Sequence, residues 1–505
     1  MNTNQQQRAG VPAQSRFVWD TSLFSTSLLV GGFCGIIRAF FLAKVLGPQA
    51  FGSWRFVNIF LDYIDFASLG TQPAVHQRIP FLRGKGDHQK VHSVLNTVFA
   101  AGFFSSIFYG LMVFVWSFLI KEPLDARALA AFSPVILLVG WLNYANGLTM
   151  ATALYPLRTR LEAMHAILTM VCSVALVYLW GIYGAIAGLG ISASVVIALY
   201  ARTLAQYAAF ALDWRILFDL ILTGFPMMAN GILLTGMSGI DKIIIAAMLS
   251  RETLGIYGVA SAATAILGTI PSAVGQMLFV KFAEIDGQQR TKAHVADILE
   301  RSTLLVSILF SPIVSISIIC FPFVVEFLLP SYSTGIAAGK FLIASTFFLC
   351  ISCPATNWCI STGSFIPVLT LRVIVIVVEA AAIYILISSA GAGLESIALC
   401  VMSSFAIFSA SIIVICHRLL GQSFQSSVTH AAKSILPFGS ILAAILVPGY
   451  LYSGGRYPSE VSSCIPPILG MVASLTLGLL AIYMIKIGTQ ISALIPKKVL
   501  RVQEK

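Results

Sequence analysis

The chain of 505 residues is 58% hydrophobic, has only 10% charged residues and carries a formal net charge of +11. A soluble protein contains roughly 25% charged residues, so this composition excludes an ordinary soluble enzyme or binding protein. Long unbroken apolar runs also exclude a membrane β-barrel, whose strands are short and alternate in polarity.

Apolar runs of ~20 residues recur from end to end, and each is long enough to cross the ~30 Å hydrocarbon core of a bilayer. We predict an all-α, polytopic membrane protein with about 14 transmembrane helices. The expected spans are 22–46, 52–75, 94–120, 128–153, 165–181, 184–203, 217–248, 254–277, 303–329, 337–361, 366–389, 392–416, 434–453 and 464–486. The sequence WGIYG leaves a very short turn between two of them.

Two distant stretches share one pattern, which indicates an internal repeat. They read GIIRAFFLAKVLGPQAFGSW at 35–54 and SGIDKIIIAAMLSRETLGIY at 238–257. In their alignment Leu46 falls on Leu249 and Gly52 on Gly255. Such repeats are typical of secondary transporters, which build two lobes around a central site. We therefore predict a six-helix N-terminal lobe at 1–215, a six-helix C-terminal lobe at 216–430, and two further helices with a basic tail at 431–505.

The positive charge is explained by membrane topology. Lys and Arg gather in alternate predicted loops, on the side that holds the N-terminus, as in 78–92 and 281–302. Cytoplasmic loops carry such an excess, so both termini are expected in the cytoplasm. Contact with anionic membrane lipids is a secondary role for these residues, and a nucleic-acid partner is not expected.

Polar residues form a stripe along the predicted span 52–75. At 100° per residue they fall within about 100° of one another on a helical wheel. They are Arg55, Asn58, Asp62, Asp65, Gln72 and His76. Charges inside a membrane are costly and usually face a cavity or a partner, so we expect the stripe to line water. The alternative is a helix that packs wholly against protein with its charges paired.

Further charges lie in the two repeat stretches. Arg38 lies deep in 22–46, whereas Lys44 is nearer the end of that span and is expected to reach the membrane interface. Asp241 occupies the repeat position of Arg38. Lys242 follows directly and is expected to point elsewhere. Arg38 either binds substrate or pairs with Asp241 as a gate.

The span 366–389 holds Arg372 and Glu379, which share a helix face and either join the cavity or form a local pair. Clustered arginines suit a diphosphate, because the guanidinium fork binds oxyanions through two hydrogen bonds. Carboxylates in a membrane suit proton or sodium coupling, or ion pairs that exchange partners during gating. The predicted substrate-binding residues are Arg38, Arg55, Arg372 and Asn58. The predicted coupling or gating residues are Asp62, Asp65, Asp241 and Glu379.

A bend point is predicted at Pro226 and Gly231, either as a hinge for lobe motion or as a static kink. The sequence lacks a G-x-x-x-x-G-K-[ST] loop, an H-E-x-x-H motif and closed Cys/His zinc spacings. ATP hydrolysis, a metal centre and a bound cofactor are therefore not expected.

Two regions resemble a known family. They are AKVLGPQAFGSW with DFASLG, at 43–54 and 65–70, and GFPMMANG with GIDKIIIAAMLSRETLGIYGVA, within 224–260. They are similar to the starts of the two lobes of bacterial Wzx-type oligosaccharide flippases, which belong to the multidrug/oligosaccharidyl-lipid/polysaccharide exporter superfamily. The resemblance implies two lobes in a V shape. It also implies movement of undecaprenyl-diphosphate-linked glycans between the leaflets of the bacterial inner membrane.

The sequence therefore predicts a flippase, not an enzyme, for exopolysaccharide or O-antigen export. Polysaccharide polymerase and export proteins are its candidate partners. One alternative is a cation-coupled multidrug antiporter of the same superfamily, against which Arg38 and Arg55 argue. Another is a membrane glycosyltransferase or polysaccharide polymerase. Such an enzyme needs a substantial extramembrane loop, whereas the longest predicted loops have only about 20 residues.

Overall fold

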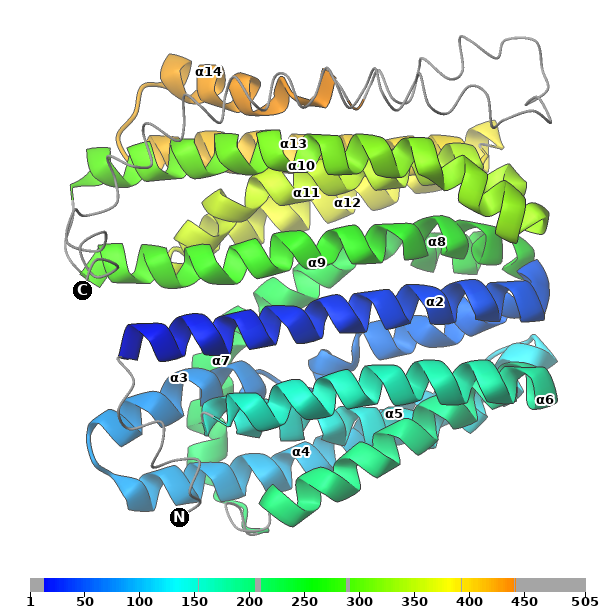
Figure 1. Cartoon of the computed structure of the whole chain (residues 1–505), viewed down its shortest axis with the longest axis horizontal. Coiled ribbons are helices and arrows are strands. Elements are labelled where there is room, and N and C mark those ends of the chain that lie inside the picture. Colours follow the sequence, from blue (N-terminus) through cyan, green and yellow to red (C-terminus); the bar gives the residue numbers. More distant parts are fainter. Residues whose placement is uncertain are drawn as a thin grey trace, which may run out of the picture.

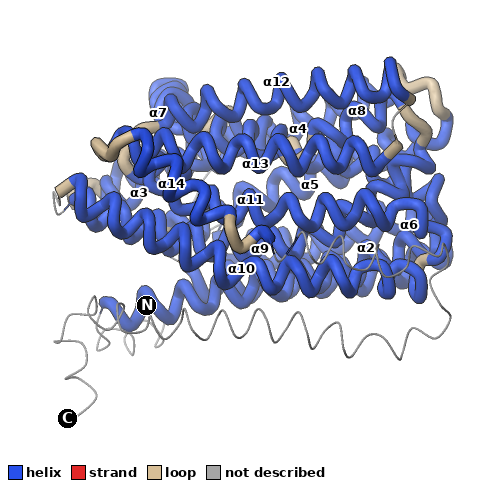
Figure 2. The backbone as a smooth tube through the Cα atoms, turned by 90° about the horizontal axis from the view of Figure 1, so that it is seen from above, coloured by secondary structure: helices blue, strands red, loops and turns tan. Residues whose placement is uncertain are grey.

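The computed structural model describes residues 13–441 except 153, 205–209, 288–290, 392 and 440. In this part of the chain the regular structure is entirely helical (Figure 2). The elements are α2 (Ala13–Asp62), η2 (Ile64–Ser68), α3 (Thr71–Gly84), α4 (His88–Ser117), α5 (Pro123–Ala151), α6 (Tyr155–Leu204), α7 (Trp214–Met237), α8 (Ile240–Met248), α9 (Arg251–Gly287), α10 (Lys292–Leu328), η3 (Pro330–Gly335), α11 (Ile336–Ser361), α12 (Phe365–Ala390), α13 (Leu394–Leu419) and α14 (Phe424–Ile435).

Within the described residues, nine helical stretches are long and apolar enough to cross a membrane. The prediction of an all-α, multi-pass membrane protein is therefore confirmed. Each predicted span from 22–46 to 392–416 overlaps a described helix. The count of about 14 is not confirmed, because most of 434–453 and all of 464–486 lie outside the described residues.

The two longest helices each turn back on themselves at a glycine (Figure 1). Both α2 and α6 contain 50 residues. A straight helix of that length would measure about 75 Å, more than twice the thickness of the hydrocarbon core. The turns lie at Gly47, with φ 71°, and Gly181, with φ 56°, a region of backbone space that glycine enters readily. Both positions agree with predicted span boundaries.

The helices lie in two groups on either side of α2. Figure 1 shows α4, α5 and α6 on one side and α10 to α13 on the other. In addition, α2 packs against α6 from the first half of the chain and against α9 from the second half. The predicted lobe boundaries at 215 and 430 stay a prediction.

The two repeat stretches meet at a reciprocal glycine contact. A Cβ atom on Gly52 would lie 1.7 Å from the Arg251 carbonyl oxygen, and one on Gly255 would lie 2.0 Å from that of Pro48. Pro48 and Arg251 are themselves equivalent in the repeat alignment. The same contact is therefore made twice, once from each half, and it requires glycine at both positions.

We expect Gly52→Ala to destabilise the fold by about 3 kcal/mol, the upper end for overpacking, because the colliding atom belongs to the backbone and cannot rotate away. The free energy of unfolding in mixed micelles measures the effect. Gly35→Ala is the matched control, because a Cβ there meets nothing within 4 Å. Equal stability of the Gly52→Ala variant and the wild type would contradict the close contact.

Two spans that the sequence predicts as continuous are interrupted. The span 52–75 breaks after Asp62, where Leu69 has φ 48° and Gly70 has φ 89°, and α3 starts afresh at Thr71. The span 217–248 breaks between α7 and α8, at Ser238 and Gly239. Broken helices inside membranes occur where the freed backbone is buried in protein or lines a cavity, often at binding sites.

Candidate functional site

A cavity of about 570 Å³ lies between α2 and helices from the second half of the chain. One wall is α2, and the opposite wall comes from α7, α8, α9, α11 and α13. Its lining includes three basic side chains, Arg38, Arg55 and Lys242, and two acidic ones, Asp62 and Asp241. The volume is typical of a small-molecule site, and the charged lining inside a membrane-spanning bundle marks a polar path or binding site.

The α2 wall holds its arginines with few hydrogen bonds. Arg55 Nη2 donates to Ser261 Oγ of α9 at 3.3 Å, and the Arg55 stem lies against Gly258, where a Cβ would come within 2.6 Å of Arg55 Cγ. Arg38 makes no hydrogen bond or ion pair with any described residue. A guanidinium has five donors, so most of the donors in this wall remain free for a ligand.

The same wall contains Asn58 and Asp62. Asn58 is 9% exposed and donates from its amide to the Trp54 carbonyl at 2.7 Å. Asp62, at the end of α2, is exposed. Arg55, Asn58 and Asp62 share one helix face, as their spacing predicts, and all three line the cavity.

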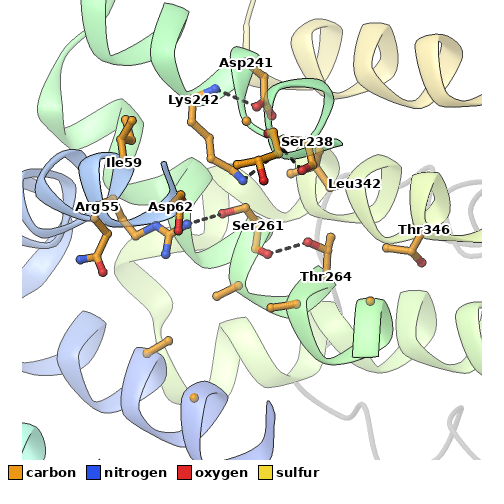
Figure 3. A pocket seen from close by; sticks show the side chains of 18 of the residues that line it. Arg55, Ile59, Asp62, Ser238, Asp241, Lys242, Ser261, Thr264, Leu342 and Thr346 are labelled. Atoms are coloured by element: carbon orange, nitrogen blue, oxygen red, sulfur yellow. Dashed lines mark hydrogen bonds between the residues drawn. The ribbon is translucent and has the colours of Figure 1, made fainter. Parts of the chain in front are cut away.

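The opposite wall is built around the break between α7 and α8. Asp241 is 2% exposed. Its carboxylate accepts hydrogen bonds from the Tyr257 hydroxyl and from the Lys242 backbone N–H. Lys242 Nζ donates to the Ser238 carbonyl at 2.8 Å. Figure 3 shows the Arg55 and Lys242 side chains extending toward the same space.

Comparison with known protein families identifies the family of this chain. Residues 41–335 match the family described as "Polysaccharide biosynthesis protein". The chain belongs to this family. No curated protein sequence matches it significantly.

Solved structures share the fold of this polysaccharide biosynthesis protein. An inward-facing multidrug resistance MATE transporter of the MOP superfamily has a TM-score of 0.63 at 12% identity, over 78% of this chain and 96% of that one. A Vibrio cholerae MATE transporter has 0.55 at 13% identity, over 80% and 99%. A Pyrococcus furiosus MOP superfamily transporter, described as having a binding pocket of reversed polarity, has 0.52 at 13% identity, over 80% and 95%. The family match confirms the polysaccharide biosynthesis protein that the two motif regions predicted, and the solved structures confirm the fold.

The polar stripe predicted on 52–75 is corrected by the helix break. Asp65 and Gln72 do not line the main cavity. They lie beside a much smaller space together with Ser68, Asn143 and Tyr144. The helical phase changes first after Asp62, where α2 gives way to the 3₁₀ helix η2 that holds Asp65, and again at Leu69 and Gly70 before Gln72. The second half of the stripe therefore turns into the first group of helices.

Arg372 and Glu379 lie away from the main cavity. Arg372 is 3% exposed and donates to the backbone carbonyl of Asn230 at 2.8 Å and to its side-chain oxygen. Its guanidinium carbon lies 5.5 Å from the centre of the Phe408 ring. The structure therefore places Arg372 at the packing of α12 against α7. No ion pair joins Arg372 to Glu379 in the described part of the chain, so the local pair is not formed.

Glu379 is fully buried, at 0% exposure. Neither of its carboxylate oxygens has a hydrogen-bond partner within the described residues. Its polar neighbours are Asp241, Ser404 and Lys242. Asp241 therefore both lines the cavity and neighbours this buried carboxyl group.

The remaining predicted features are a gate, a hinge and the lack of a metal centre. Arg38 and Asp241 both line the cavity but form no ion pair, so a gate joining them is not closed in this structure.

The α7 helix continues through Pro226 and Gly231, and its interruption lies later, at Ser238. A hinge at Pro226 and Gly231 stays a prediction. Across residues 13–441, apart from the gaps, no group of three or more His, Cys, Asp or Glu side chains is arranged to hold a metal ion.

Sequence reasoning missed Lys242 as a residue of the cavity. The prediction that it points elsewhere assumed an unbroken helix through 217–248. The dipeptide Ser238–Gly239 is the signal that could have revealed the break, because Ser-Gly pairs often mark turns.

Proposed function

We propose that this protein is a flippase that moves an oligosaccharide linked to undecaprenyl diphosphate across the bacterial inner membrane. The observation that carries the proposal is the cavity between α2 and the second half of the chain, where Arg38 and Arg55 hold free donors. A diphosphate cannot enter hydrocarbon without compensating cations, and arginine forks fit its oxygens. Membership of a polysaccharide biosynthesis family supports a glycan as the attached cargo.

In this proposal Arg38, Arg55 and Asn58 bind the diphosphate and the first sugar. Asp62 and Asp65 act as gating residues at the helix break. Arg372 is left out of the binding set, because its guanidinium is engaged with Asn230 behind the cavity. The two helix groups alternate between cytoplasmic and periplasmic opening around the bound headgroup. Both termini lie in the cytoplasm, and polymerase and export proteins receive the product.

The main alternative, a cation-coupled drug antiporter, receives less support from the lining. Three basic and two acidic side chains face the cavity, and one of the acids, Asp241, is buried with hydrogen bonds to Tyr257 and Lys242. A site for cationic drugs needs an excess of accessible acidic groups. The excess here is basic, which favours an anionic substrate.

A leaflet-exchange measurement tests the proposed function. The full chain is reconstituted in liposomes with a short-chain polyprenyl-diphosphate disaccharide that carries a fluorescent label on the sugar. We expect protein-dependent movement of the label to the leaflet protected from an external quencher. Exchange no faster than in protein-free vesicles, together with uptake of a cationic dye, would instead identify a drug antiporter.

Energy for directional movement is proposed to come from an ion gradient through Asp241 and Glu379. An ionised carboxylate without hydrogen-bond partners is very costly in a buried site. Glu379 meets this description, so the neutral acid fits the conformation seen here. A conformation that exposes Glu379 to water would release its proton, which links proton movement to the alternation of the cavity.

We expect Glu379→Gln to remove the response of transport to a proton gradient, because glutamine imitates the neutral acid and cannot release a proton. If one proton is coupled, a gradient of one pH unit changes substrate accumulation about tenfold in the wild type. The variant should show no change. Glu395→Gln, at an exposed position in the first turn of α13, is the control and should respond like the wild type. An unchanged response of Glu379→Gln would contradict this coupling site.

A further inference from the structure

Lys242 occupies an unusual position at the start of α8. In a continuous helix the backbone N–H of residue 242 would bond to the carbonyl of residue 238. Here that N–H donates to the Asp241 side chain, and the Lys242 ammonium takes the Ser238 carbonyl instead, at 2.8 Å. The helix break therefore frees a carbonyl at the end of α7, and the lysine head group is held there.

The hydrogen bond from the Lys242 ammonium to the Ser238 carbonyl is weak enough to be replaced when a ligand binds. The end of α7 offers the partial negative charge of a helix C-terminus, which attracts a cation but does not neutralise it. Lys242 forms no ion pair in the described part of the chain, and the oxygens of the neighbouring Asp241 accept from Tyr257 and from the Lys242 backbone N–H. An ammonium has three donors, and only one is used by the described residues.

The position of Lys242 complements the arginines across the cavity. Arg38 and Arg55 belong to α2, in the first half of the chain, whereas Lys242 belongs to α8, in the second half. All three line the same cavity, and Figure 3 shows Arg55 and Lys242 converging on it from opposite walls. An anion between these walls would meet cations from both halves.

We propose that Lys242 binds the diphosphate of the substrate from the second half of the chain and completes a three-cation site with Arg38 and Arg55. This inference rests on the proposed function. Lys242 takes the role that the sequence assigned to Arg372. On binding, its ammonium leaves the Ser238 carbonyl for a phosphate oxygen, so that the headgroup joins the two halves. Its four-carbon stem allows this movement, which a bidentate arginine clamp would restrict.

Binding of farnesyl diphosphate to the purified full chain in nanodiscs tests the proposal. We expect Lys242→Gln to weaken binding by about 10- to 100-fold, the range for a lost hydrogen bond to a charged group. Lys242→Arg should keep affinity within about tenfold of the wild type, because it retains the charge. Lys44→Gln is the matched control, since Lys44 is exposed on α2 and outside the cavity lining, and it should bind like the wild type.

A double-mutant cycle with Arg55→Gln supplies a second readout. If both residues contact one diphosphate, their effects on affinity are not additive. A thermal midpoint equal to that of the wild type establishes that each variant is folded. Wild-type affinity in Lys242→Gln would overturn this inference and leave the proposed function standing. A wild-type protein that binds neither farnesyl diphosphate nor inorganic pyrophosphate would overturn the proposed function itself.

Discussion

Replacing Arg55 by glutamine is expected to reduce transport of the lipid-linked oligosaccharide by at least about 100-fold. Arg55 faces the cavity with its stem packed on Gly258 and only one hydrogen bond, to Ser261. Losing a bidentate contact to a diphosphate removes two charge-assisted hydrogen bonds, each worth about 1.5–3 kcal/mol. The leaflet-exchange rate in liposomes, at equal protein level, measures the loss.

Two variants sharpen this expectation. Arg55→Lys should recover part of the rate, because the charge remains but the planar fork is lost. Arg83→Gln, at an exposed position in the last turn of α3, should transport normally. Full transport by Arg55→Gln would remove Arg55 from the binding site.

A charge swap separates the two roles predicted for Arg38. If Arg38 only gates the cavity by pairing with Asp241, the double variant Arg38→Asp, Asp241→Arg restores transport. If Arg38 contacts the diphosphate, the double variant stays inactive. The second outcome is expected here, because Asp241 is already engaged by Tyr257 and Lys242.

The largest stability effect is expected at Arg251, where the two halves of the chain are joined by an ion pair. Arg251 Nε donates to Asp125 Oδ2, and Asp125 is 1% exposed. The guanidinium also lies 4.1 Å from the centre of the Phe56 ring and donates to the Ala246 carbonyl at 2.6 Å. Arg251→Ala leaves a buried carboxylate without its partner, which typically costs about 3–5 kcal/mol.

The free energy of unfolding in mixed micelles measures this loss. Arg301→Ala is the matched control, because its pair with Asp297 is four residues away on one helix and about 40% exposed on both sides. That variant should lose at most about 0.5 kcal/mol. The double variant Arg251→Leu, Asp125→Leu should recover most of the stability, since it leaves no buried charge. An Arg251→Ala protein as stable as Arg301→Ala would show that the pair does not stabilise the fold.

The helical framework could be predicted because its signals are local. Apolar runs of membrane length mark the spans, and glycine marks the tight turns at Gly47 and Gly181. The repeat was also visible, and its aligned glycines, Gly52 and Gly255, make reciprocal backbone contacts in the structure. The sequence pattern could not show that contact, because it depends on how the two halves pack.

The candidate site was predicted only in part, and the helix breaks explain the difference. Arg55, Asn58 and Asp62 precede the break in their span and reach the cavity, whereas Asp65 follows the break and does not. Leu69 has a positive φ, which is rare for leucine. The residue type at this position therefore does not indicate a helix break, and the apolar periodicity continues through it. Lys242 was missed because the break between α7 and α8, in the second half of the chain, was not predicted either.

Arg372 fails to reach the cavity for a different reason. Helical periodicity states which residues share a face but not which neighbour that face meets. In the fold, the Arg372 guanidinium meets Asn230 of α7 and the Phe408 ring of α13. Whether Arg372 lines the cavity or is buried between helices depends on how α12 packs against α7 and α13.

A structure of the full chain with a bound polyprenyl-diphosphate oligosaccharide tests the central claim most directly. The account predicts that the diphosphate lies in the cavity, with its oxygens within hydrogen-bond distance of Arg38 and Arg55 and with the Lys242 ammonium moved from Ser238 to a phosphate oxygen. A diphosphate bound elsewhere on the protein, with the Arg38 and Arg55 donors still free, would contradict it.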